Sequence, residues 1–112
     1  MLREVEVIKA QLRRNYVTTF EGDAHGLARY AELAKGQMLG DEQGLLKLVF
    51  DPNSLKLLGV RVIGYRAAEI VHIGQTVLAL GASIEYFRAA VFNYPTLAEA
   101  YKVAALDGLN KL

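Results

Sequence analysis

The first candidate for a chemical site is a set of three polar side chains, Glu69, His72 and Thr76. Their spacing would place them on one face of a helix. A metal site needs at least three converging ligands, and only the carboxylate and the imidazole are plausible ligands here. We therefore interpret the stripe as the half-exposed polar margin of a helix. If that margin faces a partner, His72 and Gln75 are expected to make hydrogen bonds across the interface.

The second candidate is residues 94–99 (YPTLAE), which offer a phenol and a carboxylate. Thr96 and Glu99 have the spacing of a capping box, in which each side chain satisfies a free amide at the start of a helix. As an orienting carboxylate, Glu99 would need an imidazole beside it. The neighbouring position holds Tyr94, and both histidines lie far away in the sequence. The spacing alone therefore favours the cap.

The sequence excludes several kinds of catalytic site. Its 112 residues contain no cysteine, so no disulfide, thiol nucleophile or zinc-thiolate site can form within it. There is no P-loop, no G-x-G-x-x-G after a strand and no H-E-x-x-H. Residues 22–26 (GDAHG) form a glycine-flanked segment that could contact a phosphate, although we favour a plain surface loop. We expect no metal site and no complete active site.

Composition narrows the class of protein. The net charge is +1, from 13 basic and 12 acidic residues, and Arg13-Arg14 is the only basic cluster. We therefore expect no nucleic-acid partner. No apolar run approaches the ~20 residues of a membrane span and no secretion leader is present, so we expect a cytoplasmic protein and no membrane association. The apolar fraction of 53% exceeds the usual ~45–50%, which hints at an apolar face reserved for a partner.

The first 44 residues give the weaker structural patterns. Apolar residues recur at spacings of three and four near the start, at Leu2, Val5, Ile8 and Leu12. This pattern predicts an amphipathic helix ending near Arg14, whereas a rival interpretation alternates Val5 and Val7 on a strand. The following ranges are predicted as a strand (16–20), a loop (21–26), a short helix or an irregular segment (27–35) and a loop or turn (36–44).

The remainder predicts a hairpin followed by helices. Strands are predicted at 45–50 and 57–65, joined by an Asp-Pro turn at 51–54, with Val60 and Val62 on one face and Arg61 and Ile63 on the other. A helix over 66–80 ends at Gly81, and Ser83 is placed to cap the next. The expected buried stripes are Ala67, Ile70, Val71, Gly74, Val77 and Leu78, then Ile84, Phe87 and Val91, then Leu97, Ala100, Tyr101, Ala104 and Ala105.

Segregated strands and helices indicate an α+β domain with helices packed on one face of an antiparallel sheet. Residues 59–64 (GVRVIG), 67–70 (AAEI) and 94–100 (YPTLAEA) resemble the C-terminal dimerisation domain of pyridine nucleotide-disulfide oxidoreductases. Residues 66–75 and 92–101 are most similar to the soluble transhydrogenase branch of that family. The resemblance covers roughly residues 2–112 and is specific from Gly44 onward.

The resemblance implies a single dimerisation domain over residues 1–112, cut from a longer homodimeric flavoenzyme. FAD and NAD(P) domains would precede it, and this chain alone should bind no cofactor. The family's domain opens with a strand before its first helix, so we expect this chain to be truncated at its N-terminal strand. The resemblance places Tyr94 and Pro95 near the partner subunit's flavin. It leads us to expect interface contacts from His72, Gln75, Tyr94, Thr96, Glu99 and Tyr101.

One departure from the family pattern concerns the reaction. The disulfide reductases have His-Pro-Thr-x-x-Glu, in which the histidine is the acid/base, but this sequence has Tyr94 there. A tyrosine with an ordinary pKa of ~10 is a poor proton shuttle at neutral pH. Hydride exchange between two nicotinamides through a flavin needs no such base. The resemblance therefore implies a transhydrogenase. The alternatives are a dihydrolipoamide dehydrogenase-like flavoprotein and a stand-alone interaction module without cofactor.

Overall fold

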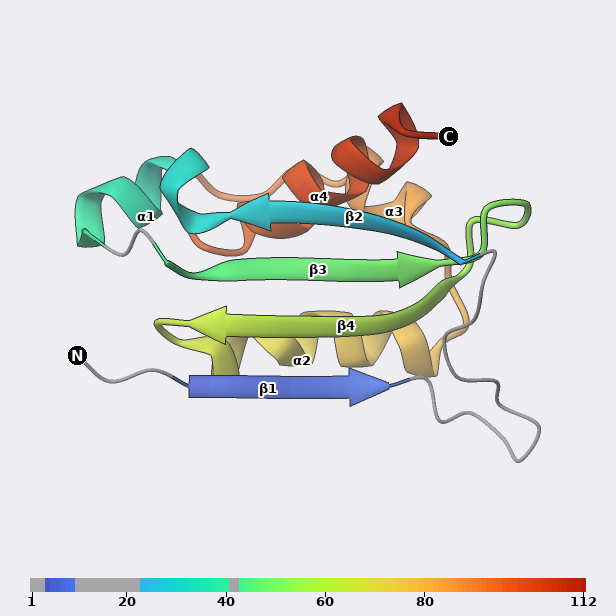
Figure 1. Cartoon of the computed structure of the whole chain (residues 1–112), viewed down its shortest axis with the longest axis horizontal. Helices are drawn as coiled ribbons and strands as arrows, with labels where there is room; N and C mark the ends of the chain where they lie inside the picture. The colour runs from blue at the N-terminus through green and yellow to red at the C-terminus, as the bar shows by residue number, and fades with distance from the viewer. Residues whose placement is uncertain (1–3, 10–22, 41–42) are drawn as a thin grey trace.

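The computed structural model describes residues 4–9, 23–40 and 43–112. The elements are β1 (Glu4–Lys9), β2 (Ala24–Arg29), the 3-10 turn η1 (Tyr30–Glu32), α1 (Ala34–Leu39), β3 (Leu45–Phe50), β4 (Leu57–Gly64), α2 (Ala67–Ala79), α3 (Glu85–Ala89) and α4 (Glu99–Asn110). The strands form a four-stranded antiparallel sheet in the order β1-β4-β3-β2. Helices α2, α3 and α4 lie on one face of it (Figure 1). The predicted α+β class is confirmed.

The core lies between this sheet and the helices. Helix α2 packs on β1 and β4, and α4 packs on β2 and β3. Residues alternate along β3, where Leu46, Leu48 and Phe50 are fully buried and the residues between them are half-buried. Helix α2 ends at Ala79 with Leu80 as its C-cap, and Gly81 adopts a left-handed φ of 71°, as its place after the helix predicted. The hairpin and the buried stripes of α2 and α4 are thus confirmed.

The predicted N-terminal helix is wrong over its described part. Residues 4–9 form β1, which pairs with β4 in a register that sets Val5 opposite Ile63 and Val7 opposite Arg61. The rival interpretation, with alternating valines on a strand, is correct. An open edge of the sheet decides between the two patterns, and the sequence cannot show that edge. The expectation of a missing strand relied on this helix and loses that support. Truncation itself stays a prediction.

The assignments for residues 21–44 also need correction. Where a loop and a short helix were predicted, β2 runs through Ala24–Arg29, with Gly26 and Ala28 buried and their neighbours more exposed. Helix α1 occupies part of the predicted loop and ends at Gly40, whose φ is 74°. The buried residues of β2 are small, so the alternation of apolar and polar residues that marks a strand is hard to detect in its sequence. The predicted strand at 16–20 lies outside the described residues.

Strand β2 is an edge of the sheet, and carboxylates bond to two of its amides. The amide of Leu27 donates to Asp107 Oδ2 of α4 at 2.9 Å, and that of Arg29 donates to Glu32 Oε1 at 3.2 Å. Unpaired edge amides are a template for pairing with another chain, so these bonds protect the edge. The first bond also fixes where α4 lies along β2.

Replacing Asp107 by asparagine should lower stability at neutral pH and have less effect in acid. Hydrogen bonds from Lys111 Nζ and from the Leu27 amide hold the pKa of Asp107 below its usual range, against an opposing effect of burial. A lowered carboxyl pKa stabilises the fold at neutral pH, and this contribution is lost as pH falls through it. Because the pair is partly exposed, we expect a loss of less than about 1 kcal/mol.

Urea unfolding of wild type and Asp107→Asn at pH 7 and at roughly pH 3 tests this expectation. The difference between the two proteins should shrink at the lower pH. A difference that stays constant would mean that the charge of Asp107 does not contribute.

Candidate functional site

The candidate site is the segment between α3 and α4, residues 90–98, in which the side chains of Val91, Asn93 and Tyr94 are exposed. Val91 is 94% exposed and Tyr94 is 74% exposed. Ile84 and Phe87 are fully buried as predicted, but the prediction that Val91 continues their stripe is wrong. Helix α3 ends at Ala89 and the chain becomes extended at Ala90, so helical spacing no longer applies at Val91. The segment therefore offers a valine and a tyrosine to a partner.

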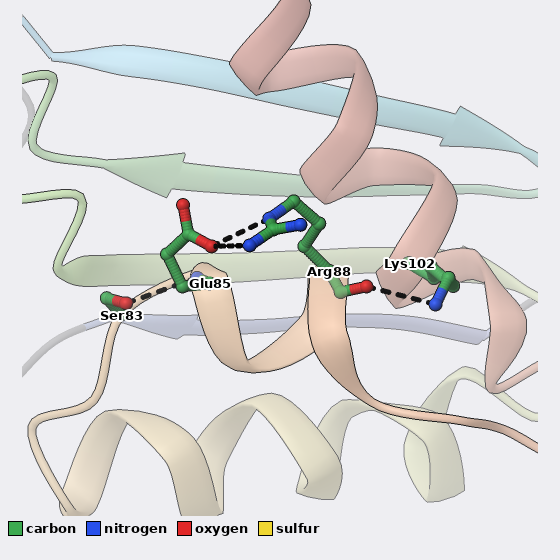
Figure 2. Close-up of polar contacts among 4 residues, drawn as sticks. All are labelled: Ser83, Glu85, Arg88 and Lys102. Atoms are coloured by element: carbon green, nitrogen blue, oxygen red, sulfur yellow. Dashed lines mark hydrogen bonds and ion pairs between the residues drawn. The ribbon is translucent and has the colours of Figure 1, made fainter.

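The start of this segment is held by polar contacts around α3 (Figure 2). Ser83 Oγ accepts a hydrogen bond from the Glu85 amide at 3.1 Å, so it bonds to the first amide of α3 as expected, but the N-cap position itself is Ile84. Glu85 and Arg88 form an ion pair of 2.6 Å along the helix. Lys102 Nζ of α4 donates to the carbonyl oxygens of Arg88 and Ala90. The end of α3 is thereby tied to the last helix.

The other end of the segment does not form the predicted capping box. Thr96 Oγ1 donates to the Asn93 carbonyl at 2.7 Å, and α4 begins only at Glu99 without a side-chain cap from Ala98. Because the helix begins later than predicted, Thr96 lies in the preceding turn, too early for the capping position. Glu99 is half-buried and has no capping-box role.

The polar stripe of α2 lies on a different element. His72 and Gln75 are both exposed and are joined by a 2.7 Å contact between Nδ1 and Oε1, which requires the imidazole proton on Nδ1. Thr76 Oγ1 donates to the His72 carbonyl. Within the described ranges, no group of three His, Asp or Glu side chains could hold a metal ion. The stripe is a polar helix margin, and its contact with a partner stays a prediction.

Tyr101 differs from the other expected interface residues because it is fully buried. Its hydroxyl donates to the Ile70 carbonyl at 2.6 Å and accepts from the Gly74 amide at 2.9 Å, so it joins α4 to α2. The structure thus corrects its assignment from a surface contact to a core residue. Its place on the apolar stripe of α4, facing the stripe that contains Gly74, was the signal for this role.

The site by itself offers contact surface and no acid/base pair. Tyr94 presents an exposed aromatic ring, which a planar cofactor held by another subunit could contact. Pro95 and Thr96 beside it are half-buried, so the tyrosine protrudes from an anchored turn. In the part of the chain that the structure describes, no helix is both long and apolar enough to cross a membrane.

Comparison with known proteins gives one consistent family. Residues 25–105 match the family model described as the pyridine nucleotide-disulphide oxidoreductase dimerisation domain. The chain is 59% identical over 87 residues to a soluble pyridine nucleotide transhydrogenase of Mycobacterium tuberculosis, covering 78% of this chain and 19% of that protein. It is 48% identical over 90 residues to the Pseudomonas fluorescens protein of the same name, with the same coverage.

Solved structures of low sequence identity share the fold. LpdA of Mycobacterium tuberculosis superposes with a TM-score of 0.71 at 15% identity, covering 75% of this chain and 18% of that one. The HOCl-induced flavoprotein disulfide reductase RclA of Escherichia coli gives 0.70 at 19% identity, covering 75% and 19%. This chain thus spans about a fifth of the length of the proteins that it resembles.

Proposed function

The chain belongs to the dimerisation-domain family of pyridine nucleotide-disulphide oxidoreductases, and we propose that it serves a soluble NAD(P)+ transhydrogenase as the domain that joins its two subunits. The observation that supports this most is Tyr94, which occupies the histidine position of the disulfide reductases and is exposed to solvent. The relatives with high identity are named soluble transhydrogenases. In this proposal the whole enzyme is a cytoplasmic homodimer.

The surface of the described residues supports a role in dimerisation. Large apolar side chains are exposed just after α2, on α3 and in the segment after α3, including Leu80 at 78%, Tyr86 at 53% and Val91 at 94%. An exposed apolar side chain on its own needs no explanation, but tyrosines are enriched in protein interfaces. Among the predicted interface residues, His72, Gln75 and Tyr94 are exposed, and Thr96 and Glu99 are half-buried. These residues therefore remain available to a second subunit.

The cofactors of the proposed enzyme are FAD and NAD(P), held by domains outside this chain. This sequence contains no glycine-rich dinucleotide fingerprint. The residues present fit a flavin only as a contact, through the exposed ring of Tyr94 with Pro95 beside it. Bound FAD would supply hydride exchange between the two nicotinamide cofactors. The role of this chain is to place Tyr94 against the partner subunit's flavin and to keep the subunits together.

Three observations test the proposal. The purified 112-residue chain should show no visible flavin absorbance, and light scattering after size exclusion should show a concentration-dependent dimer. The reading frame upstream of Met1 should encode FAD and NAD(P) fingerprints without a C-x-x-x-x-C redox pair. Flavin bound tightly to this chain alone would contradict the proposal. A redox cysteine pair upstream would favour disulfide chemistry instead.

A further inference from the structure

Lys102 makes two bonds that the proposed function does not use. Its ammonium donates to the carbonyl of Arg88 at 3.0 Å (Figure 2). It also donates to the carbonyl of Ala90 at 2.9 Å. The last carbonyls of a helix have no partner within the helix, so they need donors from elsewhere. In α3 the donor comes from a different helix, α4. Lys102 therefore ties two elements together at the point where α3 ends.

The nearest cation on α3 itself does not replace this contact. The guanidinium of Arg88 bonds to Glu85 Oε1 through Nε at 2.7 Å and through Nη2 at 2.6 Å, so it is directed back along α3. At the end of the helix, Arg88 contributes only its backbone carbonyl, which accepts the hydrogen bond from Lys102. The half-buried Lys102 is thus a specific donor to this turn.

The position of these bonds matters because the chain changes direction there. Ala90 has a φ of −68° and a ψ of 151°, so it is the first extended residue after α3. From Ala90 the chain passes through Tyr94 to Leu97, which is 6% exposed and packed in the core. Tyr94 therefore lies between two anchors, the Lys102 contact and the buried Leu97.

We infer that Lys102 is a positioning residue: it fixes where residues 90–98 leave α3, and so where Tyr94 meets the partner subunit's flavin. The second half of this statement depends on the proposed function. The first half is a property of this chain alone and can be measured separately.

The first experiment is amide hydrogen exchange on the full-length protein that contains this chain, with Lys102→Met as the test variant. The Ala90 amide donates to the Tyr86 carbonyl at 2.9 Å, so it reports on the end of α3. Without the ammonium, this amide should exchange about tenfold faster. Lys102→Arg should restore most of the protection. The matched control is Lys111→Met at the C-cap of the same helix, where Lys111 pairs with Asp107, and it should leave Ala90 unchanged.

The second experiment measures the absorbance and fluorescence of the bound flavin and the steady-state kinetics of the dimer. Lys102→Met should shift the flavin absorbance and fluorescence of the dimer in the same direction as Tyr94→Ala. It should lower kcat by about tenfold and leave the KM for the nucleotides unchanged, because only the contact to the flavin moves. Lys102→Arg should recover kcat. A lysine that only stabilises the domain would change neither the spectrum nor kcat of the folded dimer.

The outcomes separate this inference from the proposed function. Unchanged exchange at Ala90 in Lys102→Met overturns the inference. So does a flavin signal that responds to Tyr94→Ala and ignores Lys102→Met. If Tyr94→Ala leaves the flavin unaffected, or if no flavin domain accompanies this chain, the proposed function fails. Exchange at Ala90 then decides whether Lys102 anchors the segment.

Discussion

Replacing Tyr101 by alanine is expected to lower the free energy of unfolding by about 4 kcal/mol, the usual cost of deleting a large buried aromatic side chain. The ring is fully buried and stacks on Phe87, with centroids 4.8 Å apart. Its removal leaves a cavity between α2, α3 and α4. Thermal or urea unfolding followed by circular dichroism measures the loss.

The hydroxyl of Tyr101 makes a separate contribution. It bridges the Ile70 carbonyl and the Gly74 amide, which are four residues apart and pair directly in a regular α-helix. Burial raises the pKa of Tyr101 well above its usual range, so the hydroxyl keeps its proton and continues to donate wherever the protein is folded. The bridge should therefore be insensitive to pH.

Tyr101→Phe isolates the hydroxyl, because it keeps the stacked ring and removes only the bridge. We expect it to cost about 1–2 kcal/mol, since two buried backbone groups lose a partner. A phenylalanine variant as stable as wild type would show that α2 closes its own hydrogen bond and that the bridge is dispensable. An alanine variant no worse than the phenylalanine variant would contradict the buried stacking.

The sequence predicted those parts of the fold whose apolar residues have a clear period. Helix α2 and helix α4 each bury a stripe of large or small apolar side chains. Along β3, buried side chains alternate with half-buried ones. The Asp51 turn was equally readable, because Asp51 Oδ1 accepts from the Asn53 and Ser54 amides as such turns require. In these regions the local pattern and the tertiary packing agree.

The N-terminal elements depend on partners that are distant in the sequence. Val5 and Val7 belong to a strand because β4 offers them an open edge, across more than fifty residues of chain. Residues 24–29 form a strand because β3 pairs on one side and Asp107 bonds on the other. No local pattern contains this information, so short ambiguous segments were assigned wrongly.

The candidate site shows the same division. Tyr94 is proposed from its place in a family motif, and the structure shows only that its side chain is exposed. Thr96 and Glu99 fit a capping box by spacing, but the helix begins two residues later than that box requires, which removes it. The contact of Lys102 with α3 was missed because a lysine one turn into a helix has no sequence signature. Only the packing of α4 against α3 reveals it.

Replacing Gly26 by alanine is expected to destabilise the domain by about 3 kcal/mol or more, at the upper end of the cost of overpacking. An added Cβ would lie 2.0 Å from the Ala104 carbonyl oxygen and 3.0 Å from the Gly108 amide nitrogen. Both obstacles are backbone atoms of α4, so neither can move as a flexible side chain would. The helix would have to shift away from β2 and weaken the Asp107 contact to Leu27.

Gly40→Ala is the matched control for this prediction, because its Cβ meets nothing within 4 Å although its φ is 74°. It should cost about 1 kcal/mol through backbone strain alone. If Gly26→Ala costs no more than Gly40→Ala in urea unfolding, α4 does not pack this closely on β2. If it costs more, the glycine in β2 is explained by the approach of the helix. Gly26 gives β2 a weak strand pattern in the sequence because it has no side chain. The same lack of a side chain lets α4 pack closely on the sheet.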